Sequence, residues 1–375
     1  MPALPLAAVF ADLPDPRRET ENKRHPLATV LALATCAVIA GADTWDDIAE
    51  YATAKADFFR RFVDLANGVP SPDTFARVFA KLDPAAFARA FGRWMAATGE
   101  ATGLIPIAVD GKSARSAPAH TATGCLHLVT AWATENRVVL GQVSVADGSN
   151  EVAAIPELLR TLDLAGALVT IDAAGCQVDN AGIIRERKGH YLLAVKDNQP
   201  TLRAAVEGVF DHACETEFAG AAHDGHEAVT DGHGRHDERY VTVVYDPVGL
   251  PPEWPDAAAV VQVNRVREMG GTRTQTTHYY LTSHRGTAAE LGHVIRSHWG
   301  IESMHWSLDV VYREDDSRVR EGHAGANLGL VRRVAVALTR RGPGKASGKT
   351  KRKRAGWDDD YLLQILQGFP AIIVR

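Results

Sequence analysis

The chain of 375 residues is 46% hydrophobic and 23% charged, and its formal net charge is −5. This is an ordinary globular composition with enough apolar surface for a sizeable core, and the length favours two domains or one domain with a large insertion. The charge excludes a uniformly basic chain, although residues 296–354 hold 14 Lys and Arg against 6 Asp and Glu, a local excess of +8.

Residues 1–100 have the apolar spacing of helices, which are expected at 27–41, 45–65, 72–82 and 87–95. The nearly charge-free run 26–42 is shorter than the ~20 residues that a membrane span needs, so a buried core helix and no membrane association are expected. The N-terminus lacks a basic start followed by an uninterrupted apolar run, so no secretory signal is expected. The four cysteines (Cys36, Cys125, Cys176 and Cys214) are scattered without metal-ligand spacing, which favours a reducing compartment.

From residue 103 the pattern changes to strands and helices. Strands are expected at 104–109, 126–133, 138–145, 167–171 and 191–195, and helices at 150–162 and 178–188. This order is typical of an RNase H-like fold, an α/β architecture in which a mixed five-stranded sheet carries flanking helices. In that fold the first strand lies beside the fourth and parallel to it, so both strands end at the same edge of the sheet.

Residues 200–285 depart from this order and are expected to form a mostly β insertion. The insertion is expected to contain a helix at 202–210, a His-, Gly- and Asp-rich loop at 221–237, and strands at 239–244, 258–267 and 274–281. One long helix is then expected at 288–310 and a basic helix at 326–340. The basic segment 342–354 is expected to be flexible, before a short helix at 361–366. The predicted domains are a helical N-terminal domain (1–100), the α/β domain with its insertion (101–340) and a basic flexible tail with a short helix (341–375).

Two aspartates each end an apolar, strand-like run: Asp110 after 104–109 and Asp172 after 167–171. An aspartate in such a place often only starts a turn or caps a helix. Here, however, the expected fold would place the two carboxylates side by side, and carboxylates this close repel unless a cation lies between them. The small residues Gly111 and 173–175 would allow a phosphate backbone to approach.

Glu302 is the third candidate acid. Alone it would be an exposed helix residue, but Trp299, Ile301, Trp306 and Leu308 put apolar bulk around it. Glu302 is therefore expected to face inward, where a carboxylate needs a partner. Three carboxylates are hard oxygen ligands that suit Mg²⁺ or Mn²⁺. Two such ions would activate a water or a 3′-hydroxyl and stabilise the leaving oxygen in phosphodiester chemistry, so no side-chain nucleophile would be required.

Other polar clusters have competing interpretations. The spacing of His223, His226, His233 and His236 could suit zinc, but a solvated loop with His233 and Arg235 as phosphate contacts is the favoured interpretation. The acidic run 314–316 could bind a metal, although its arginine neighbours favour a salt-bridged helix end. The glycine-containing segments match neither a P-loop nor a dinucleotide fingerprint, so no nucleotide cofactor is implied.

Basic residues of the α/β domain are candidates for phosphate contact, although each alone is more often an ordinary surface charge. These residues are Lys112, Lys196, Arg318, Arg320, Arg332 and Arg333. The tail 349–354 would add at most a non-specific, salt-sensitive attraction. A basic C-terminal stretch on an acidic body suits a protein that meets phosphate on one face, and it suits equally a soluble protein with a basic tail.

Several segments match, in order, those of a known family. They include residues 10–18, 70–79, 109–112 (Val109-Asp110-Gly111-Lys112), 150–159, 170–177, 196–199 (Lys196-Asp197-Asn198-Gln199), 232–235 and 298–302 (His298-Trp299-Gly300-Ile301-Glu302). On these matches the chain resembles, over almost its whole length, the bacterial insertion-sequence transposases of the H-repeat-associated type, a branch of the DDE transposases.

The resemblance implies that Asp110, Asp172 and Glu302 are the DDE triad and hold two Mg²⁺ ions, with Mn²⁺ as a possible substitute. It further implies metal-dependent cleavage and strand transfer at the ends of an insertion sequence. The implied partners are double-stranded DNA, as terminal inverted repeats and target, and a second copy of the chain in a homodimer on that DNA. The implied location is the bacterial cytoplasm.

The chain departs from the wider class around its glutamate. That class places a Tyr, an Arg and a Lys there, whereas this chain has Ile295, His298 and Asp309 at the corresponding spacings. His298, one turn before Glu302, is expected to replace the Arg as a phosphate contact. Two alternatives stay open: a catalytically silent DNA-binding remnant of a transposase, and a nuclease that cuts without strand transfer.

Overall fold

The computed structural model describes residues 9–19, 23–96, 104–114, 126–134, 138–145, 150–232 and 235–367. The chain divides into two compact units. The first comprises residues 1–100, 111–154 and 302–375, and the second comprises residues 101–110 and 155–301. Strand β1 (Ile105–Ala114) and helix α11 (Gly300–Val310) each begin in the second unit and end in the first.

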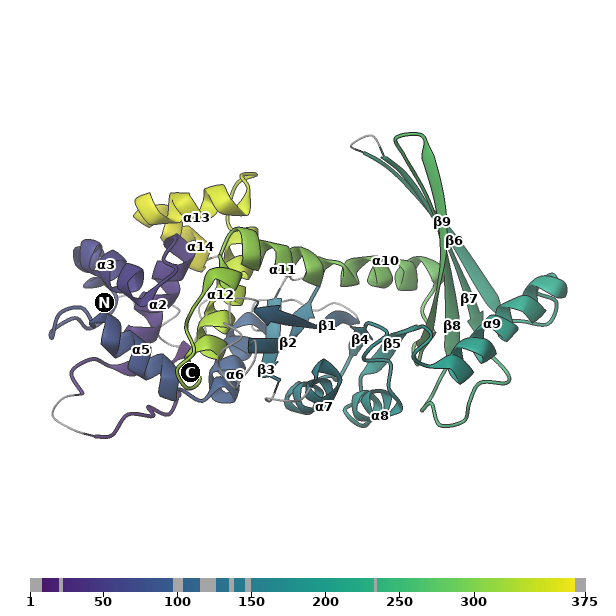
Figure 1. Cartoon of the computed structure of the whole chain (residues 1–375), viewed down its shortest axis with the longest axis horizontal. Coiled ribbons are helices and arrows are strands. Elements are labelled where there is room, and N and C mark those ends of the chain that lie inside the picture. The colour runs from purple at the N-terminus through teal and green to yellow at the C-terminus, as the bar shows by residue number, and fades with distance from the viewer. Residues whose placement is uncertain are drawn as a thin grey trace. The chain divides into compact units, whose positions relative to one another are not determined.

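The N-terminal part of the first unit is helical, as its apolar spacing predicts (Figure 1). Its helices are α2 (Leu27–Ala40), α3 (Trp45–Ala54), α4 (Ala56–Phe59), α5 (Pro72–Lys81) and α6 (Pro84–Ala96). Thr44 and Asp47 form a capping box at the start of α3, and Ser71 caps α5, whose first residue is a proline. The ring of Phe10 packs on Phe87 and Phe91, with centroids 5.7 and 5.2 Å away.

Within the described ranges, no single helix is long and apolar enough to cross a membrane. Helices α2 and α3 together are long and apolar enough to cross a membrane by length and composition alone, but they are bent by 96° where they meet.

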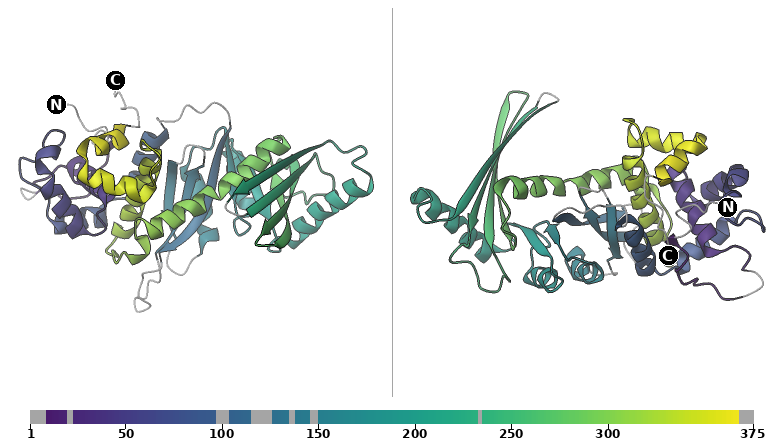
Figure 2. Two further views of the ribbon diagram at one scale, coloured as in Figure 1. Left: turned by 90° about the horizontal axis from the view of Figure 1, so that it is seen from above. Right: turned by 180° about the vertical axis from the view of Figure 1, so that it is seen from behind.

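Three further helices belong to the first unit: α12 (Ala324–Arg341), α13 (Gly348–Trp357) and α14 (Asp359–Gln367). Helices α12 and α13 pack against α2 (Figure 2). The prediction that 342–354 is flexible is wrong, because α13 occupies most of it. Ser347 caps that helix, and the buried Arg352 donates hydrogen bonds to the carbonyl oxygens of Val38 and Ala42 and to the carboxylate of Asp43. A basic sequence therefore forms an ordered helix because one of its cations has fixed interior partners.

The sheet has the strand order β3-β2-β1-β4-β5-β9-β8-β7-β6. Strands β1 and β4 (Ala167–Ile171) are parallel, as are β4 and β5 (His190–Val195), whereas β2 (Leu126–Ala133) and β3 (Val138–Ser144) are antiparallel. Helices α7 (Glu151–Thr161) and α8 (Val178–Glu186) follow β3 and β4. The mixed α/β class and the placement of the first strand beside the fourth are confirmed.

Among the residues that the structure describes, the sheet has nine strands and not the predicted five, because the insertion extends it. After α9 (Pro200–Glu215) come β6 (His223–Gly232), β7 (Arg235–Tyr245), β8 (Ala259–Met269) and β9 (Thr272–Thr282). The last of these pairs antiparallel with β5, so the insertion is added at the edge that β5 would otherwise leave open. The loop predicted at 221–237 is wrong for most of its length, because β6 pairs with β7 from His223↔Val244 to Gly232↔Arg235.

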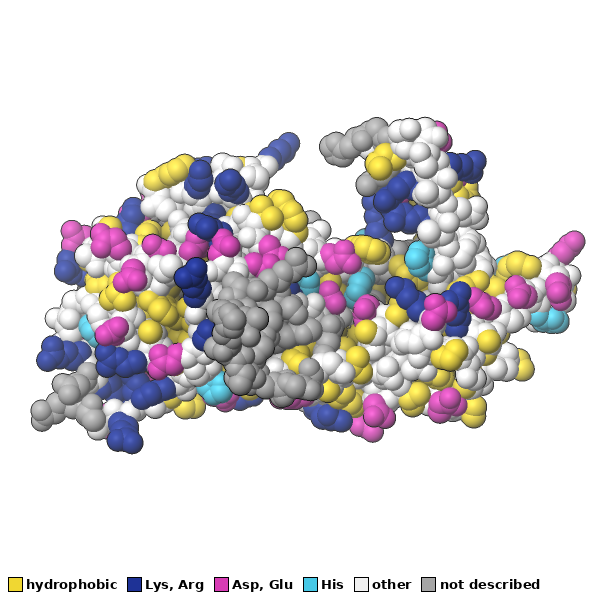
Figure 3. All heavy atoms as spheres, in the orientation of Figure 1, with side chains coloured by type: hydrophobic (Ala, Val, Ile, Leu, Met, Phe, Trp, Pro, Cys, Tyr) yellow, Lys and Arg dark blue, Asp and Glu magenta, His cyan; other side chains and the backbone are white. Residues whose placement is uncertain are grey.

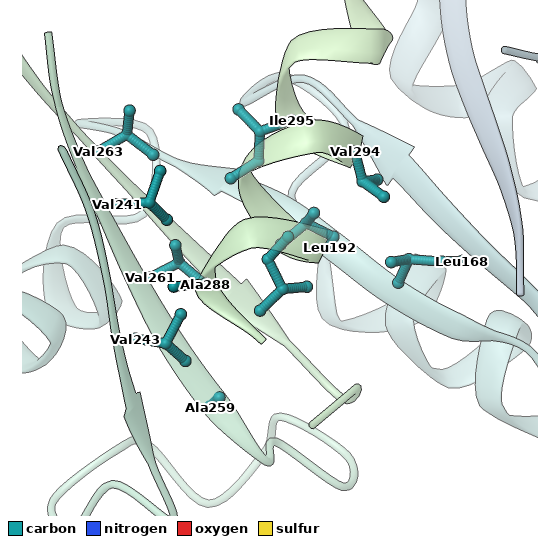
Figure 4. Packing of buried hydrophobic residues seen from close by; sticks show 11 residues of the cluster. Leu168, Leu192, Val241, Val243, Ala259, Val261, Val263, Ala288, Val294 and Ile295 are labelled. Atoms are coloured by element: carbon teal, nitrogen blue, oxygen red, sulfur yellow. The ribbon is translucent and has the colours of Figure 1, made fainter. Parts of the chain in front are cut away.

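Helix α10 (Ala288–His298) packs on one face of the insertion (Figure 4). Val294 of α10 shares a buried cluster with Val241 of β7 and Val263 of β8. A Cβ added at Gly292 would lie 2.8 Å from Cγ2 of Val241, so glycine allows the helix to approach the strand closely. The single helix predicted at 288–310 is wrong. Trp299 closes α10, and α11 begins at the next residue.

Candidate active site

Two carboxylates lie at the parallel ladder between β1 and β4. The ladder runs from Ile105↔Ala167 to Val109↔Ile171, so Asp110 and Asp172 are the next residues of two adjacent strands. Adjacent strands lie about 4.8 Å apart, and residues in register share a face. One detail differs from the prediction: β1 continues to Ala114, so Asp110 lies within its strand and not at the end. The catalytic role of the pair stays a prediction.

Asp172 begins a loop between β4 and α8 that has a fixed conformation. Its Oδ1 accepts a hydrogen bond from the backbone N–H of Gly175 at 3.2 Å. A Cβ at Gly175 would lie 2.2 Å from Cγ2 of Ile171 and 2.9 Å from Cδ1 of Ile155. Glycine is therefore required where the loop turns back over β4.

The segment after β5 supports the same loop from the other side. Asn198 Nδ2 donates to the carbonyl oxygen of Ala173 at 2.6 Å, and Gln199 Nε2 donates to that of Cys176 at 2.9 Å. These two amide side chains hold the loop that carries Asp172. Sequence reasoning missed this role, although two adjacent amides three and four residues after a buried strand were an available signal.

His298, the last residue of α10, lies against β4. Its Nδ1 is 2.7 Å from Oγ1 of Thr170, two residues before Asp172. Desolvation lowers the pKa of His298 to about 4, although the nearby Asp172 opposes this shift. The imidazole is therefore neutral at neutral pH. Its predicted phosphate contact stays a prediction, and it would use a neutral N–H donor and not a cation.

Glu302 lies in the first turn of α11. The prediction that it faces inward is wrong: Ile301 and Met304 form the buried side of the helix, and the Glu302 side chain is exposed. Trp299 and Trp306, which were expected to surround it, are themselves 57% and 61% exposed. Partial desolvation nevertheless raises the pKa of Glu302. The meeting of Glu302 with the two aspartates stays a prediction that comes from the resemblance.

Within the described ranges, no three or more His, Cys, Asp or Glu side chains come together in a way that could hold a metal ion. The pair Asp110 and Asp172 still fits a hard divalent cation, because two carboxylates on adjacent strands supply only oxygen donors. The zinc alternative gains no support. His236 instead bonds to Asp231 at 2.6 Å and Glu238 at 3.0 Å, and His233 lies outside the described residues.

Lys112 was predicted to contact phosphate, but it lies buried in an ion-pair network of the first unit. Its Nζ is 2.6 Å from Asp309, 3.3 Å from Glu314 and 3.2 Å from Asp315. Arg333, another predicted contact, is fully buried with Nη1 2.7 Å from Glu314. Desolvation opposes ionisation of Glu314, but Arg333 and Lys112 outweigh it and lower its pKa. Both cations are therefore engaged inside the fold and not on a surface that DNA can reach.

The other predicted phosphate contacts differ in exposure. Arg332 is buried and donates to the carbonyl oxygen of Asp43 at 3.2 Å. Arg320 is half-buried and bonds to backbone carbonyls of its own loop. Lys196 and Arg318 are exposed, and Arg235 begins β7. The acidic run 314–316 forms a short 3₁₀ turn whose Asp316 pairs with Arg313 at 2.8 Å, which agrees with the salt-bridged interpretation.

Comparison with known proteins gives matches over most of the chain. Residues 102–336 match the Transposase DDE domain, and residues 7–95 match the DDE_Tnp_1-associated domain. The chain is 37% identical over 367 residues to Putative transposase YncI of Escherichia coli O157:H7, with 94% of this chain and 92% of the relative covered. It is 36% identical over 361 residues to H repeat-associated putative transposase YhhI of Escherichia coli strain K12, with 94% and 95% covered. A piggyBac transposase synaptic complex with hairpin DNA aligns at a TM-score of 0.38 and 9% identity, over 97% of this chain and 77% of that one, a likeness too weak to carry an argument.

Proposed function

Because the chain belongs to the DDE transposase family, we propose that it cuts and joins DNA at Asp110 of β1 and Asp172, which directly follows β4. In the first step a water attacks the phosphorus at the end of the element, and the broken bond leaves a 3′-hydroxyl and a 5′-phosphate. In the second step that 3′-hydroxyl attacks a phosphodiester of the target DNA. The new bond joins element to target, and a target 3′-hydroxyl leaves.

The adjacency of Asp110 and Asp172 is the observation that carries this proposal. Two ionised carboxylates on neighbouring strands repel, and a cation between them removes the repulsion. Their oxygen atoms would bind two ions of Mg²⁺ or Mn²⁺, and Glu302 would be the third carboxylate ligand. Such ions, when bound, would activate the attacking hydroxyl and stabilise the leaving oxygen.

The other residues near Asp172 would position the catalytic groups and take no covalent part in the reaction. Asn198 and Gln199 bond to the carbonyl oxygens of Ala173 and Cys176, and so they would restrict the movement of the loop that begins at Asp172. Burial raises the pKa of the Cys176 thiol to about 12, so this thiol is not a nucleophile at neutral pH. The proposed attacking group is a water or a DNA hydroxyl, which the metal ions would activate. His298, whose Nδ1 is 2.7 Å from Oγ1 of Thr170, would donate a neutral hydrogen bond to a phosphate near Asp172.

The proposed partner is double-stranded DNA, bearing the terminal repeats of the element or serving as target. Two ends of one element have to be processed together for the element to move. The proposed active form is therefore a homodimer on DNA, with one catalytic site for each end.

The test uses purified protein, Mg²⁺ and a labelled duplex that ends in the element's own terminal repeat. We expect strand cleavage by the wild type. Asp172→Asn should lower its rate at least about a hundredfold, because several kcal/mol of transition-state stabilisation is lost. Asp179→Asn, an exposed acid at the start of α8, is the matched control and should cleave like the wild type.

Three outcomes would replace the proposal. Full cleavage by Asp172→Asn would remove the assigned site. Binding of the terminal repeat without cleavage would indicate a silent DNA-binding remnant. Cleavage without joining of a pre-cut 3′-hydroxyl end to a second duplex would indicate a nuclease.

A further inference from the structure

The four insertion strands carry opposite charges on their two faces. Successive residues of a strand point to opposite faces, and residues paired across strands share a face. Arg239 of β7 pairs with Arg265 of β8, and Asp237 pairs with Arg267, so these four share one face. The other face carries Glu227, Asp231, His236, Glu238, Glu268 and Arg273. One face is therefore mainly basic, and the other is mainly acidic.

The basic face is the one on which α10 packs. Val241, two residues after Arg239 on β7, belongs to the core beneath α10. At the other end of the helix, Arg296 Nη1 donates to Oγ1 of Thr230 at 3.1 Å, and Thr230 pairs with Asp237. The last turn of α10 therefore lies beside the arginines of the sheet, and Figure 1 shows that the strands continue beyond the helix.

Asp237 fixes two of the arginines. It is 1% exposed, and its Oδ1 accepts hydrogen bonds from Arg265 Nε at 3.2 Å, Arg265 Nη2 at 3.0 Å and Arg267 Nε at 2.9 Å. Each guanidinium has five N–H donors, so these bonds orient the groups without using most of their donors. Arg265 and Arg267 keep side-chain exposures of 26% and 34%.

This arrangement favours an anion on the basic face. Among the described side chains, Asp237 lies among these four arginines, and the second aspartate of this face, Asp224, lies at the start of α10, where it accepts a hydrogen bond from the backbone N–H of Ala288. Like charges that lie directly opposite on paired strands, as Arg239 and Arg265 do, ordinarily destabilise a sheet. An external polyanion would attract the guanidinium groups of this face, and the acidic residues of the other face would repel the same ligand.

We propose that the arginine face, formed by Arg239, Arg265, Arg267 and Arg296, binds the phosphate backbone of duplex DNA. Figure 3 shows Lys and Arg side chains gathered on the strands beyond α10. Guanidinium groups suit phosphates because they donate paired hydrogen bonds in a plane. The inference rests on the proposed function for the class of its partner and adds the surface that holds it.

The position of the arginine face fits this role. Arg296 precedes His298 by two residues, and His298 contacts Thr170 near the end of β4. A duplex held by the arginines would therefore lie beside the helix end that reaches the strand of Asp172. None of the four arginines was a candidate in the sequence, because it is the strand register that brings them together.

The test compares two charge reversals in the full-length protein. Arg296→Glu changes an exposed residue of the arginine face, and Arg273→Glu changes an exposed residue on the opposite face of the same sheet. The probe is a random-sequence duplex of about 30 base pairs, because phosphate contacts do not depend on sequence. Its binding is measured by fluorescence anisotropy over a series of salt concentrations.

We expect Arg296→Glu to weaken binding roughly tenfold and to lower the slope of log K against log salt by about 1. Arg273→Glu should stay within about twofold of the wild type at the same salt. The double variant Arg239→Gln/Arg267→Gln leaves Arg265 on Asp237 and should lower the slope by about 2. Circular dichroism melts establish that each variant is folded, and the double variant decides the matter if Arg296→Glu does not fold.

The outcomes separate this inference from the proposed function. Equal binding by the Arg296→Glu and Arg273→Glu variants, with a wild type that binds and cleaves, would overturn the arginine face and leave the function intact. Undiminished cleavage by Asp172→Asn, with weakened binding by Arg296→Glu, would overturn the catalytic proposal and leave the surface. A wild type that binds no duplex would overturn both.

Discussion

Gly175 has no side chain, and this absence lets the loop that carries the candidate catalytic residue Asp172 pack closely on Ile171 and Ile155. In Gly175→Ala the added Cβ would clash with Ile171 and Ile155, so the loop that holds Asp172 has to move. We expect the free energy of unfolding to fall by about 1–3 kcal/mol, and strand cleavage to fall with it. Urea unfolding and the cleavage assay measure the two effects.

Gly182→Ala is the matched control for this substitution. Gly182 lies inside α8, and nothing approaches its Cβ position within 4 Å. Because alanine favours a helix over glycine, we expect the free energy of unfolding to rise by up to about 1 kcal/mol. Equal stability of the two alanine variants would show that the Asp172 loop is not tightly packed.

His298 makes stability depend on pH. Its pKa is about 4 in the folded protein against an ordinary value of 6.5, so the unfolded chain takes up the proton first as the pH falls. The contribution of the neutral His298 to the free energy of unfolding is fully present above pH 6.5 and is lost progressively between pH 6.5 and pH 4. The whole shift corresponds to at most about 3 kcal/mol.

His298→Gln removes this titration and keeps a hydrogen-bonding side chain beside Thr170. Between about pH 7 and about pH 5 we expect the wild type to lose roughly 1–2 kcal/mol more stability than the variant. Urea unfolding at the two pH values measures the difference. Parallel pH profiles would place the imidazole in water and not against β4.

At the scale of elements, the ion-pair network of Lys112 joins β1 to α11 within the first unit. Lys112→Met would leave Asp309, Glu314 and Asp315 without a shared cation. Removing one partner of a buried network is strongly destabilising, so we expect a loss of about 3–5 kcal/mol in urea unfolding. Arg60→Ala, which removes an exposed pair with Asp57, should change stability by less than about 1 kcal/mol. Similar losses in both variants would mean that the network is open to water.

The sequence could predict elements whose apolar and polar residues follow the pattern of buried and exposed positions in the fold. The apolar runs before Asp110 and Asp172 are buried strands, and their order in the chain was enough to place them side by side. The strand β6 could not be predicted, because its His, Gly and Asp residues favour a loop and only pairing with β7 makes it a strand. Likewise α13 depends on the buried partners of Arg352, which no local pattern reveals.

The same reason explains which parts of the site were missed. The inward position predicted for Glu302 assumed that nearby tryptophans are buried, whereas Trp306 lies on the exposed side of α11. Lys112 and Arg333 were expected on the surface because charge usually is, and their buried carboxylate partners are distant in sequence. The order of strands can be derived from local patterns, but partners of buried charges cannot.

At the scale of the whole molecule, the proposed function has two copies of the chain handle the two ends of an element. We expect mass photometry of the protein with terminal-repeat duplexes to show complexes that hold two 40.4 kDa chains. Arg296→Glu should raise the protein concentration at which these complexes form without changing their stoichiometry, since it weakens phosphate contacts. An active complex with one chain per duplex would exclude the dimer.

The ladder between β1 and β4 also restricts how this sequence can evolve. Deletion of one residue within 105–109 would move Asp110 by one position in the ladder and turn its carboxylate to the opposite face from Asp172. Deletion of one residue in the connection before β4 (163–166) would leave the ladder in register. Among descendants that remain mobile, variation in length is therefore expected between the strands and not inside them. A copy with a single lost codon in β1 would still build the sheet and yet be unable to move itself.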